Sequence, residues 1–262
     1  MNDPQRTGTM REYVLEETNW KRVRDGRFDV VVLPWGSTEA HNYHMPYGTD
    51  TMHAVAVAHE AARLATERGA RVLVLPAIPF GVQTGQLDIP FCINLNPATQ
   101  GIVLADIVES LEPHGVKAFV VMNGHGGNDF KSLIRELQPR TPIFLCTVNW
   151  WRSVNPSDFF TEPGDHAGEL ETSVIMHLAP DLVRLADAGP GAERKFRIAA
   201  LREGWAWAPR QWTQVTDDTG VGDPRAATAA KGAAFMEAAT ARVADFLVEL
   251  ASSDPRDLYT SQ

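Results

Sequence analysis

The sequence predicts an α/β fold with a mainly parallel β-sheet flanked by helices. Short apolar runs alternate along the chain with longer segments of helical pattern, as in successive βαβ units. The runs are continuously apolar, which is typical of strands that are covered on both faces. Glycine or proline lies next to most of these segments and marks where they end.

Four strands are expected from short runs of β-branched and other apolar residues. The first two runs each end in proline, and the later two follow glycine or begin with proline, so that each run is only a few residues long. The expected strands cover residues 29–34, 71–76, 116–122 and 142–148.

Five helices are expected between and after these strands. Asn96 and Pro97 cap and open one of them, which ends before Gly115. Pro139 stops a short helix, another ends before Pro180, and the last helix is long and rich in alanine. The expected ranges are 50–64, 97–114, 128–137, 167–178 and 224–252.

The length of 262 residues is compatible with one large domain, and we expect residues 1–262 to form a single α/β domain. Residues 186–223, here called the excursion, are irregular and contain Trp205, Trp207 and Trp212. So long a segment without clear elements is typical of a lid or an oligomer arm, although a packed surface segment is equally compatible. The sequence leaves open whether the excursion lines a pocket or an interface. The last ten residues are expected to form a loose tail.

Composition excludes several classes of function. Lys and Arg number 24 against 33 Asp and Glu, so the net charge is −9 and sequence-independent binding of nucleic acid is not expected. No apolar run approaches the ~20 residues of a membrane span, and residues 1–27 contain no secretory signal. The two cysteines, Cys92 and Cys146, are expected to be reduced thiols in a cytoplasmic protein.

Polar side chains follow the first expected strand, at the edge of the sheet where ligands bind in parallel α/β folds. Glu39 and His41 are two residues apart, so in an extended segment both project to the same side. Asp50 stands at the start of the next helix, where a carboxylate is most often a cap. The presence of Glu39 and His41 in the same loop, however, favours a role for Asp50 as a metal ligand.

A second polar segment, Asn123-Gly-His125-Gly-Gly-Asn128, follows the third strand. It lacks the pattern of a phosphate-binding loop, and its glycines favour a sharp turn that brings His125 close to a ligand.

A third segment, from His166 onward, follows the fourth strand. If a helix begins near Ala167, His166 and Glu169 share one face, whereas Glu171 points about 200° away from Glu169. We therefore expect Glu169 to be the site residue and Glu171 to support it or cap the helix.

These residues form a mixed set of nitrogen and oxygen ligands that suits Zn, Mn or Fe. The set exceeds what one tetrahedral zinc ion needs, so two divalent metal ions are expected. In that arrangement Glu39, Asp50 and His125 hold one ion, and His41, Asp50 and Glu169 hold the other. Such a pair binds a shared hydroxide and polarises a carbonyl group.

The motifs GSTEAHNYHMPYGTD, NGHGGN, HAGELETS and GVGDP resemble those of the creatininase (creatinine amidohydrolase) family, over residues 30–231. The resemblance implies a compact α/β fold, a hexamer built as a trimer of dimers, and a binuclear Zn, Mn or Fe site that hydrolyses cyclic amides or formamides. It implies Glu39, His41, Asp50 and His125 as ligands, and His166 as the proton donor.

The chain departs from creatininase itself at several positions. Gly127 stands where creatininase has a glutamate ligand, so the branch with NGHGGN and HAGE, which includes formamide-cleaving pyrimidine deformylases, is more similar, and there Glu169 would supply the missing ligand. Further departures lie at Ala40, Asn42 and Tyr43 and in residues 89–92, where the substrate is expected.

We therefore expect a metal-dependent amidohydrolase that cleaves a C–N bond of a small cyclic amide or formamide. His166 would protonate the leaving nitrogen, and Glu169 would act beside it. Substrate contacts are expected from His44, Asn128, Trp150 and Trp151, although His44 and the tryptophans are also compatible with structural roles. The alternatives are a lactone or ester hydrolase or a lyase with the same metals, and a non-catalytic metal-binding scaffold. A nicotinamide-dependent oxidoreductase is disfavoured because its fingerprint is missing.

Overall fold

The computed structural model describes residues 10–260 and contains one four-stranded, all-parallel β-sheet. The strand order is β2-β1-β3-β4, with β1 at Val30–Trp35, β2 at Val72–Val74, β3 at Ala118–Asn123 and β4 at Phe144–Asn149. Each expected strand is found within two residues at its start. The predicted fold class, a parallel sheet flanked by helices, is confirmed.

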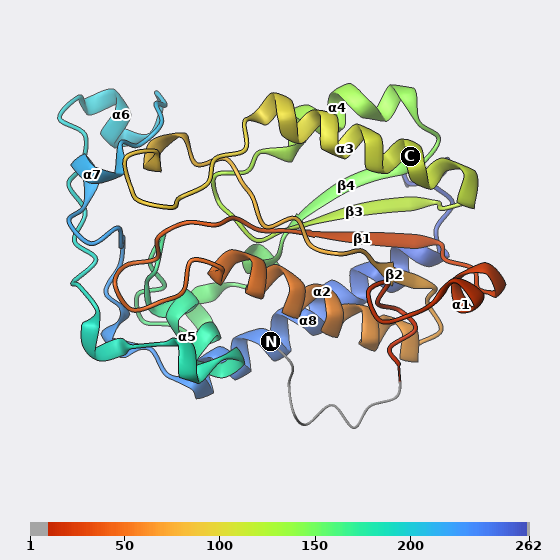
Figure 1. Ribbon diagram of the computed structural model, residues 1–262, viewed down its shortest axis with the longest axis horizontal. Helices are drawn as coiled ribbons and strands as arrows, with labels where there is room; N and C mark the ends of the chain where they lie inside the picture. The colour runs from red at the N-terminus through yellow and green to blue at the C-terminus, as the bar shows by residue number, and fades with distance from the viewer. Residues whose placement is uncertain (1–9, 261–262) are drawn as a thin grey trace.

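Helices cover both faces of this sheet (Figure 1). On one face lie α2 (Thr49–Glu67), α5 (Glu169–Leu178) and α8 (Ala229–Ser252), and on the other lie α3 (Pro97–Leu111) and α4 (Phe130–Leu137). Alternate residues of β1 point to opposite faces, so Val30 and Val32 join one buried cluster while Val31 and Leu33 join the other. Two-sided burial is the reason why the strands are apolar throughout.

Three of the expected helices begin later in the structure than in the prediction. Helix α4 begins at Phe130 rather than at residue 128, and α5 begins at Glu169 rather than near residue 167. Helix α8 begins at Ala229 after a short 3₁₀ turn, Pro224–Ala226. Helix α8 packs against α2 and α5. The approach to α5 is so close that a Cβ atom on Gly232 would lie 2.0 Å from the carbonyl oxygen of Ser173.

Three short helices were not predicted. They are α1 (Trp20–Asp25), α6 (Ala199–Glu203) and α7 (Trp212–Val215), and the last two lie within the excursion. In Figure 1, α6 and α7 lie beyond one end of the sheet, the end at which β1 leads into α2. Of the expected tail, residues 253–260 contain no helix or strand, and residues 261–262 lie outside the described part of the chain.

The strand order reverses direction between β1 and β3, because the chain passes from β1 to β2 on one side and then to β3 on the other. In open α/β sheets, the crevice at the carboxyl ends of such strands is the usual binding site. Trp35 and Asn123 are paired at these ends, so the loops that follow β1 and β3 start side by side. Among residues 10–260, no helix is both long enough and apolar enough to cross a bilayer.

Candidate metal centre

The loops after β1 and β3 bring three of the expected side chains to one point. Glu39 comes from the loop after β1, Asp50 from the first turn of α2, and His125 from the turn after β3, and all three are buried. The turn after β3 lies directly against α2, since a Cβ atom on Gly124 would lie 2.3 Å from the carbonyl oxygen of Asp50. Glycine at this position is what allows His125 to approach Asp50.

The ligand atoms form two groups that share Asp50. In the first group, Nδ1 of His125 lies 2.8 Å from Oε1 of Glu39 and 3.0 Å from Oδ2 of Asp50. In the second, Nε2 of His41 lies 3.2 Å from Oδ1 of Asp50 and 4.0 Å from Oε2 of Glu171. In each group, one atom from each residue lies within 4.8 Å of the others. We call Glu39, His41, Asp50, His125 and Glu171 the candidate metal centre.

Hydrogen bonds to neighbouring groups fix which ligand atoms face the centre. Nδ1 of His41 lies 3.1 Å from the carbonyl oxygen of Glu39, and Nε2 of His125 lies 3.1 Å from that of Val82. In neutral imidazoles these nitrogens donate their protons to the carbonyls and leave Nε2 of His41 and Nδ1 of His125 free as ligands. Gln86 donates a hydrogen bond from Nε2 to Oε2 of Glu39, which leaves Oε1 directed at the centre.

The charges within the centre support its assignment to cations. Oε1 of Glu39 and Oδ2 of Asp50 are buried and accept no hydrogen bond of acceptable geometry. Burial opposes charge on His41, but the carboxylates of Asp50, Glu171 and Glu39 outweigh burial and raise the pKa of His41 to about 10. The pKa of His125 is likewise raised well above its usual value against the effect of burial, by Glu39 and Asp50. Carboxylates that draw protons onto both imidazoles in this way fit a site for divalent cations.

The structure does not bring Glu169, which we expected to be a ligand, together with the other candidate ligands. Both oxygens of Glu169 are engaged elsewhere: Oε1 pairs with Nζ of Lys231 in α8, and Oε2 accepts hydrogen bonds of 3.0 Å from the backbone N–H groups of Thr161 and Glu162. Burial raises the pKa of Glu169, but these partners outweigh burial and lower it. Glu171 occupies the position that we expected Glu169 to fill.

The backbone around Ala167 explains this exchange of roles. His166 belongs to a bridge with Val221 rather than to a helix, Ala167 adopts a left-handed conformation with φ of 53°, and Gly168 is extended. The helix therefore begins only at Glu169, and an argument from helical spacing that includes His166 does not apply. Glu171 turns back toward the first turn, where its Oε2 accepts a 2.7 Å hydrogen bond from the N–H of Ala167.

His166 lies at the border of the candidate metal centre. Its ring lies 4.3 Å from the ring of His41 and 4.7 Å from that of Trp212, measured between centroids. Nε2 of His166 lies 2.9 Å from the carbonyl oxygen of Ala40. Glu39, His41 and His166 also bring ligand-type atoms within 4.8 Å of one another, so His166 lies within reach of whatever the centre binds.

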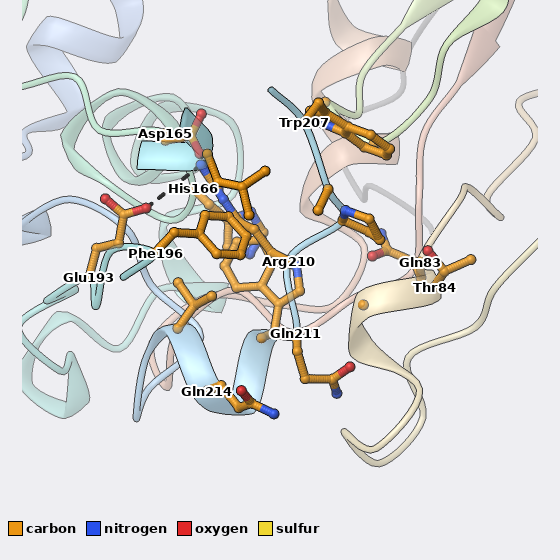
Figure 2. A pocket seen from close by; sticks show the side chains of 18 of the residues that line it. Gln83, Thr84, Asp165, His166, Glu193, Phe196, Trp207, Arg210, Gln211 and Gln214 are labelled. Atoms are coloured by element: carbon orange, nitrogen blue, oxygen red, sulfur yellow. Dashed lines mark hydrogen bonds and ion pairs between the residues drawn. The ribbon is translucent and has the colours of Figure 1, made fainter. Parts of the chain in front are cut away.

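Two cavities meet at this centre. The larger, of about 1330 Å³, is lined by Glu39, Asp50, His125, His166 and Glu171 and by much of the excursion. Figure 2 looks into this cavity, with Glu193 and Phe196 on one side and Gln83 and Thr84 on the other. The smaller, of about 210 Å³, is also lined by His166 and Glu171. Within the excursion, Trp207 and Trp212 line the larger cavity, whereas Trp205 does not.

The expected substrate-binding residues lie in different places. Trp150 and Trp151 line the smaller cavity, although Trp150 is buried and also packs against Phe235 in the core. Asn128 borders the same cavity, but its amide is occupied by hydrogen bonds to neighbouring loops and side chains. His44 lines neither cavity. It is buried, and its Nε2 lies 2.8 Å from Oγ1 of Thr172.

Sequence reasoning missed Gln86 as the partner of Glu39. Gln86 lies in a 3₁₀ turn, Thr84–Gln86, within an irregular stretch, and no spacing in the sequence connects it with Glu39. Helical spacing predicts only a supporting or capping role for Glu171. The signal that favours it as a candidate ligand is Gly168, which can delay the start of a helix and so change the face on which each glutamate lies.

Comparisons with known proteins find a matching family model and similar proteins. The family model for creatinine amidohydrolase matches residues 16–247. The mycofactocin precursor peptide peptidase of Mycobacterium tuberculosis is 32% identical over 233 residues, which cover 83% of this chain and 85% of that protein. A crystal structure from Bacteroides fragilis, described as a candidate creatinine amidohydrolase, superimposes with a TM-score of 0.89 at 44% identity and covers 95% of this chain and 99% of that one.

Creatininase structures are also similar to this chain. A creatininase mutant described as the Zn-Zn type superimposes with a TM-score of 0.76 at 25% identity, covering 92% of this chain and 99% of its own. The presence of metal in such a neighbour is consistent with the orphaned carboxylate oxygens found here.

Proposed function

We propose that this chain, which belongs to the creatinine amidohydrolase family of C–N hydrolases, cleaves a small cyclic amide or a formamide with a pair of divalent metal ions. The observation that carries this proposal is the sharing of Asp50 between two ligand groups. One carboxylate that faces two such groups is the arrangement that a bridged pair of ions requires.

The residues present suit two ions of the Zn, Mn or Fe type. Glu39, Asp50 and His125 would hold one ion, and His41, Asp50 and Glu171 the other. Bound there, such ions supply a hydroxide nucleophile near neutral pH and stabilise negative charge on the carbonyl oxygen. Gln86 keeps Glu39 oriented, and the backbone carbonyls of Glu39 and Val82 keep the two imidazoles in the ligating tautomer.

His166 is the group that we assign to protonation of the leaving nitrogen. It borders both cavities and is within reach of the centre, and its ring is held between His41 and Trp212. An imidazole in such a place can pass a proton to the leaving nitrogen as the C–N bond breaks. The ring of Trp212 contacts that of His166 and restricts its orientation.

The two cavities support a division of the substrate at the scissile bond. The smaller cavity, walled by Trp150 and Trp151, has room for a formyl group or part of a small ring. The larger cavity has room for a much longer group on the other side of the amide. This second observation favours a peptide bond as an additional candidate, in keeping with the name of the mycobacterial relative.

The proposal is tested by elemental analysis followed by turnover measurements. Protein loaded with Zn, Mn or Fe is assayed on cyclic amides, formamides, short peptides and matched lactones. We expect two ions per chain and hydrolysis of at least one amide. The variant His166→Gln should keep its metal and lose turnover. Hydrolysis of lactones alone, or full metal content with no turnover on any amide, would contradict the proposal.

A further inference from the structure

Outside the candidate metal centre, the residues that line the larger cavity, here called its wall, include more basic than acidic side chains, although the chain as a whole has a net charge of −9. The basic residues that line it all belong to the excursion: Arg194, Lys195, Arg197, Arg202 and Arg210. Outside the candidate metal centre, the acidic residues that line it are Asp129, Asp165 and Glu193.

Some of these basic side chains already have partners. Arg210 pairs with Asp165 and lies 3.9 Å from Glu193, so its single positive charge is shared between two carboxylates. Arg194 pairs with Asp217. Arg202 donates hydrogen bonds of 3.1 Å to the carbonyl oxygens of the two residues 196 and 197.

Two cations remain. Within residues 10–260, the side chains of Lys195 and Arg197 form no ion pair and no hydrogen bond, and both are exposed at the cavity wall. Phe196 lies between them in sequence and also lines the cavity, so this stretch combines positive charge with an apolar surface. Charged groups that line a cavity without a partner are suited to bind an oppositely charged ligand.

We propose that the substrate carries an anionic group, a carboxylate or a phosphate, which Lys195 and Arg197 bind while the amide lies at the candidate metal centre. This inference rests on the proposed function and adds the charge of the substrate to it. A guanidinium binds either anion through two parallel hydrogen bonds, and an ammonium adds a point charge. Phe196 and Trp207 would contact an apolar part of the substrate between the amide and the anion.

The size and charges of the cavity support this orientation. A volume of about 1330 Å³ exceeds the ~300–1,000 Å³ of ordinary small-molecule sites, so the wall can hold a group that is remote from the scissile bond. The ligand groups at the floor include three carboxylates, from Glu39, Asp50 and Glu171, which the bound ions neutralise. The wall retains its charge with or without ions.

The test uses two pairs of small aromatic probes, each with an anionic and a neutral member. Binding of N-benzoylglycine and of its neutral amide to the zinc-loaded protein is measured by calorimetry, with phenyl phosphate and phenol as the phosphate arm. The double variant Lys195→Gln/Arg197→Gln is compared with Lys131→Gln/Arg135→Gln, which removes the same charge from exposed positions on α4 outside the cavity.

The wild type should bind the charged member of a pair roughly three- to tenfold more tightly than the neutral one. The cavity double variant should lose this preference and keep its affinity for the neutral probe, whereas the α4 double variant should behave as the wild type. The preference should also decrease as salt is added. The arm with the larger preference identifies the anion as carboxylate or phosphate.

Three results would overturn the inference. They are equal affinity for charged and neutral probes, no binding of either charged probe at millimolar concentration, and a preference that survives in the cavity double variant, which would place the anion on the zinc ions. Failure here is separable from failure of the proposed function. Hydrolysis of neutral amides without an anion preference removes only the inference, while an anion preference without hydrolysis of any amide removes only the function.

Discussion

The different surroundings of Glu169 and Glu171 lead to opposite expectations for two matched variants, Glu169→Gln and Glu171→Gln. Glu169 is tied to Lys231 and to two backbone N–H groups, whereas Glu171 faces His41 and Asp50. We therefore expect Glu169→Gln to retain its metal and lose stability. Glu171→Gln should lose one ion and most of its activity while remaining folded.

The expected loss of folding stability in each variant follows from the burial and the charge of the side chain that is replaced. The Glu169 side chain is 1% exposed and Lys231 is 33% exposed, so the ion pair is partly screened by solvent on one side only. An amide oxygen can still accept the two backbone hydrogen bonds, but the charge is lost, and we expect a cost of about 2 kcal/mol. For a chain of this size that corresponds to a fall in Tm of about 4–8 °C. Burial raises the pKa of Glu171, so its neutral replacement should cost no more than about 1 kcal/mol.

Metal content by elemental analysis and Tm by calorimetry, both on metal-loaded and metal-stripped protein, separate the two roles. The stripped protein is essential, because bound metal itself stabilises the folded state. Loss of metal from Glu169→Gln together with full metal content in Glu171→Gln would refute the assignment. So would equal thermal stability of stripped wild type and stripped Glu169→Gln.

Three further predictions concern residues around the site and in the fold. The variant Gln86→Leu removes the donor to Oε2 of Glu39, so affinity for metal, measured by competition with a chelator, should fall roughly 10–100-fold, and an unchanged affinity would contradict the role of Gln86. Gly232→Ala places a Cβ atom 2.0 Å from the carbonyl oxygen of Ser173, so the free energy of unfolding measured in urea should fall by about 1–3 kcal/mol. In the control Gly101→Ala, the new Cβ atom meets only Leu133, at 3.3 Å, and α3 should not be destabilised. Burial raises the pKa of Asp29, but Arg71 and Lys117 outweigh burial and lower it, so Asp29→Asn should lose about 1 kcal/mol at neutral pH. Because a lowered folded pKa gives stability only while the carboxylate is ionised, the difference from wild type should shrink as the pH falls below 3.8, and a difference that is constant with pH would contradict it.

The strands and the convergence of most candidate ligand residues were predictable because the relevant signals are local. Continuous apolar runs mark strands that are buried on two faces, and the carboxyl ends of parallel strands must lie at one edge. Glu39, His41, Asp50 and His125 follow such ends closely, so their convergence required no knowledge of distant contacts.

The features that the sequence did not reveal depend on the backbone or on distant contacts. The structure favours Glu171 over Glu169 as a candidate ligand because the left-handed conformation of Ala167 shifts the start of α5, and propensity does not reveal such a conformation. Gln86 and the residues of the excursion reach the site through loops whose paths are set by tertiary packing. The expected single domain, cytoplasmic location and hexameric assembly stay predictions.

The floor and the wall of the larger cavity come from different parts of the chain. The groups that would hold metal lie between residues 39 and 171, whereas residues 193–215 supply most of the wall. Mutations within residues 193–215 can therefore alter substrate selectivity while the candidate metal ligands stay unchanged. A protein built in this way can acquire new substrates over evolutionary time while its chemistry is retained, and grafting residues 186–223 between relatives is a direct route to changing selectivity in the laboratory.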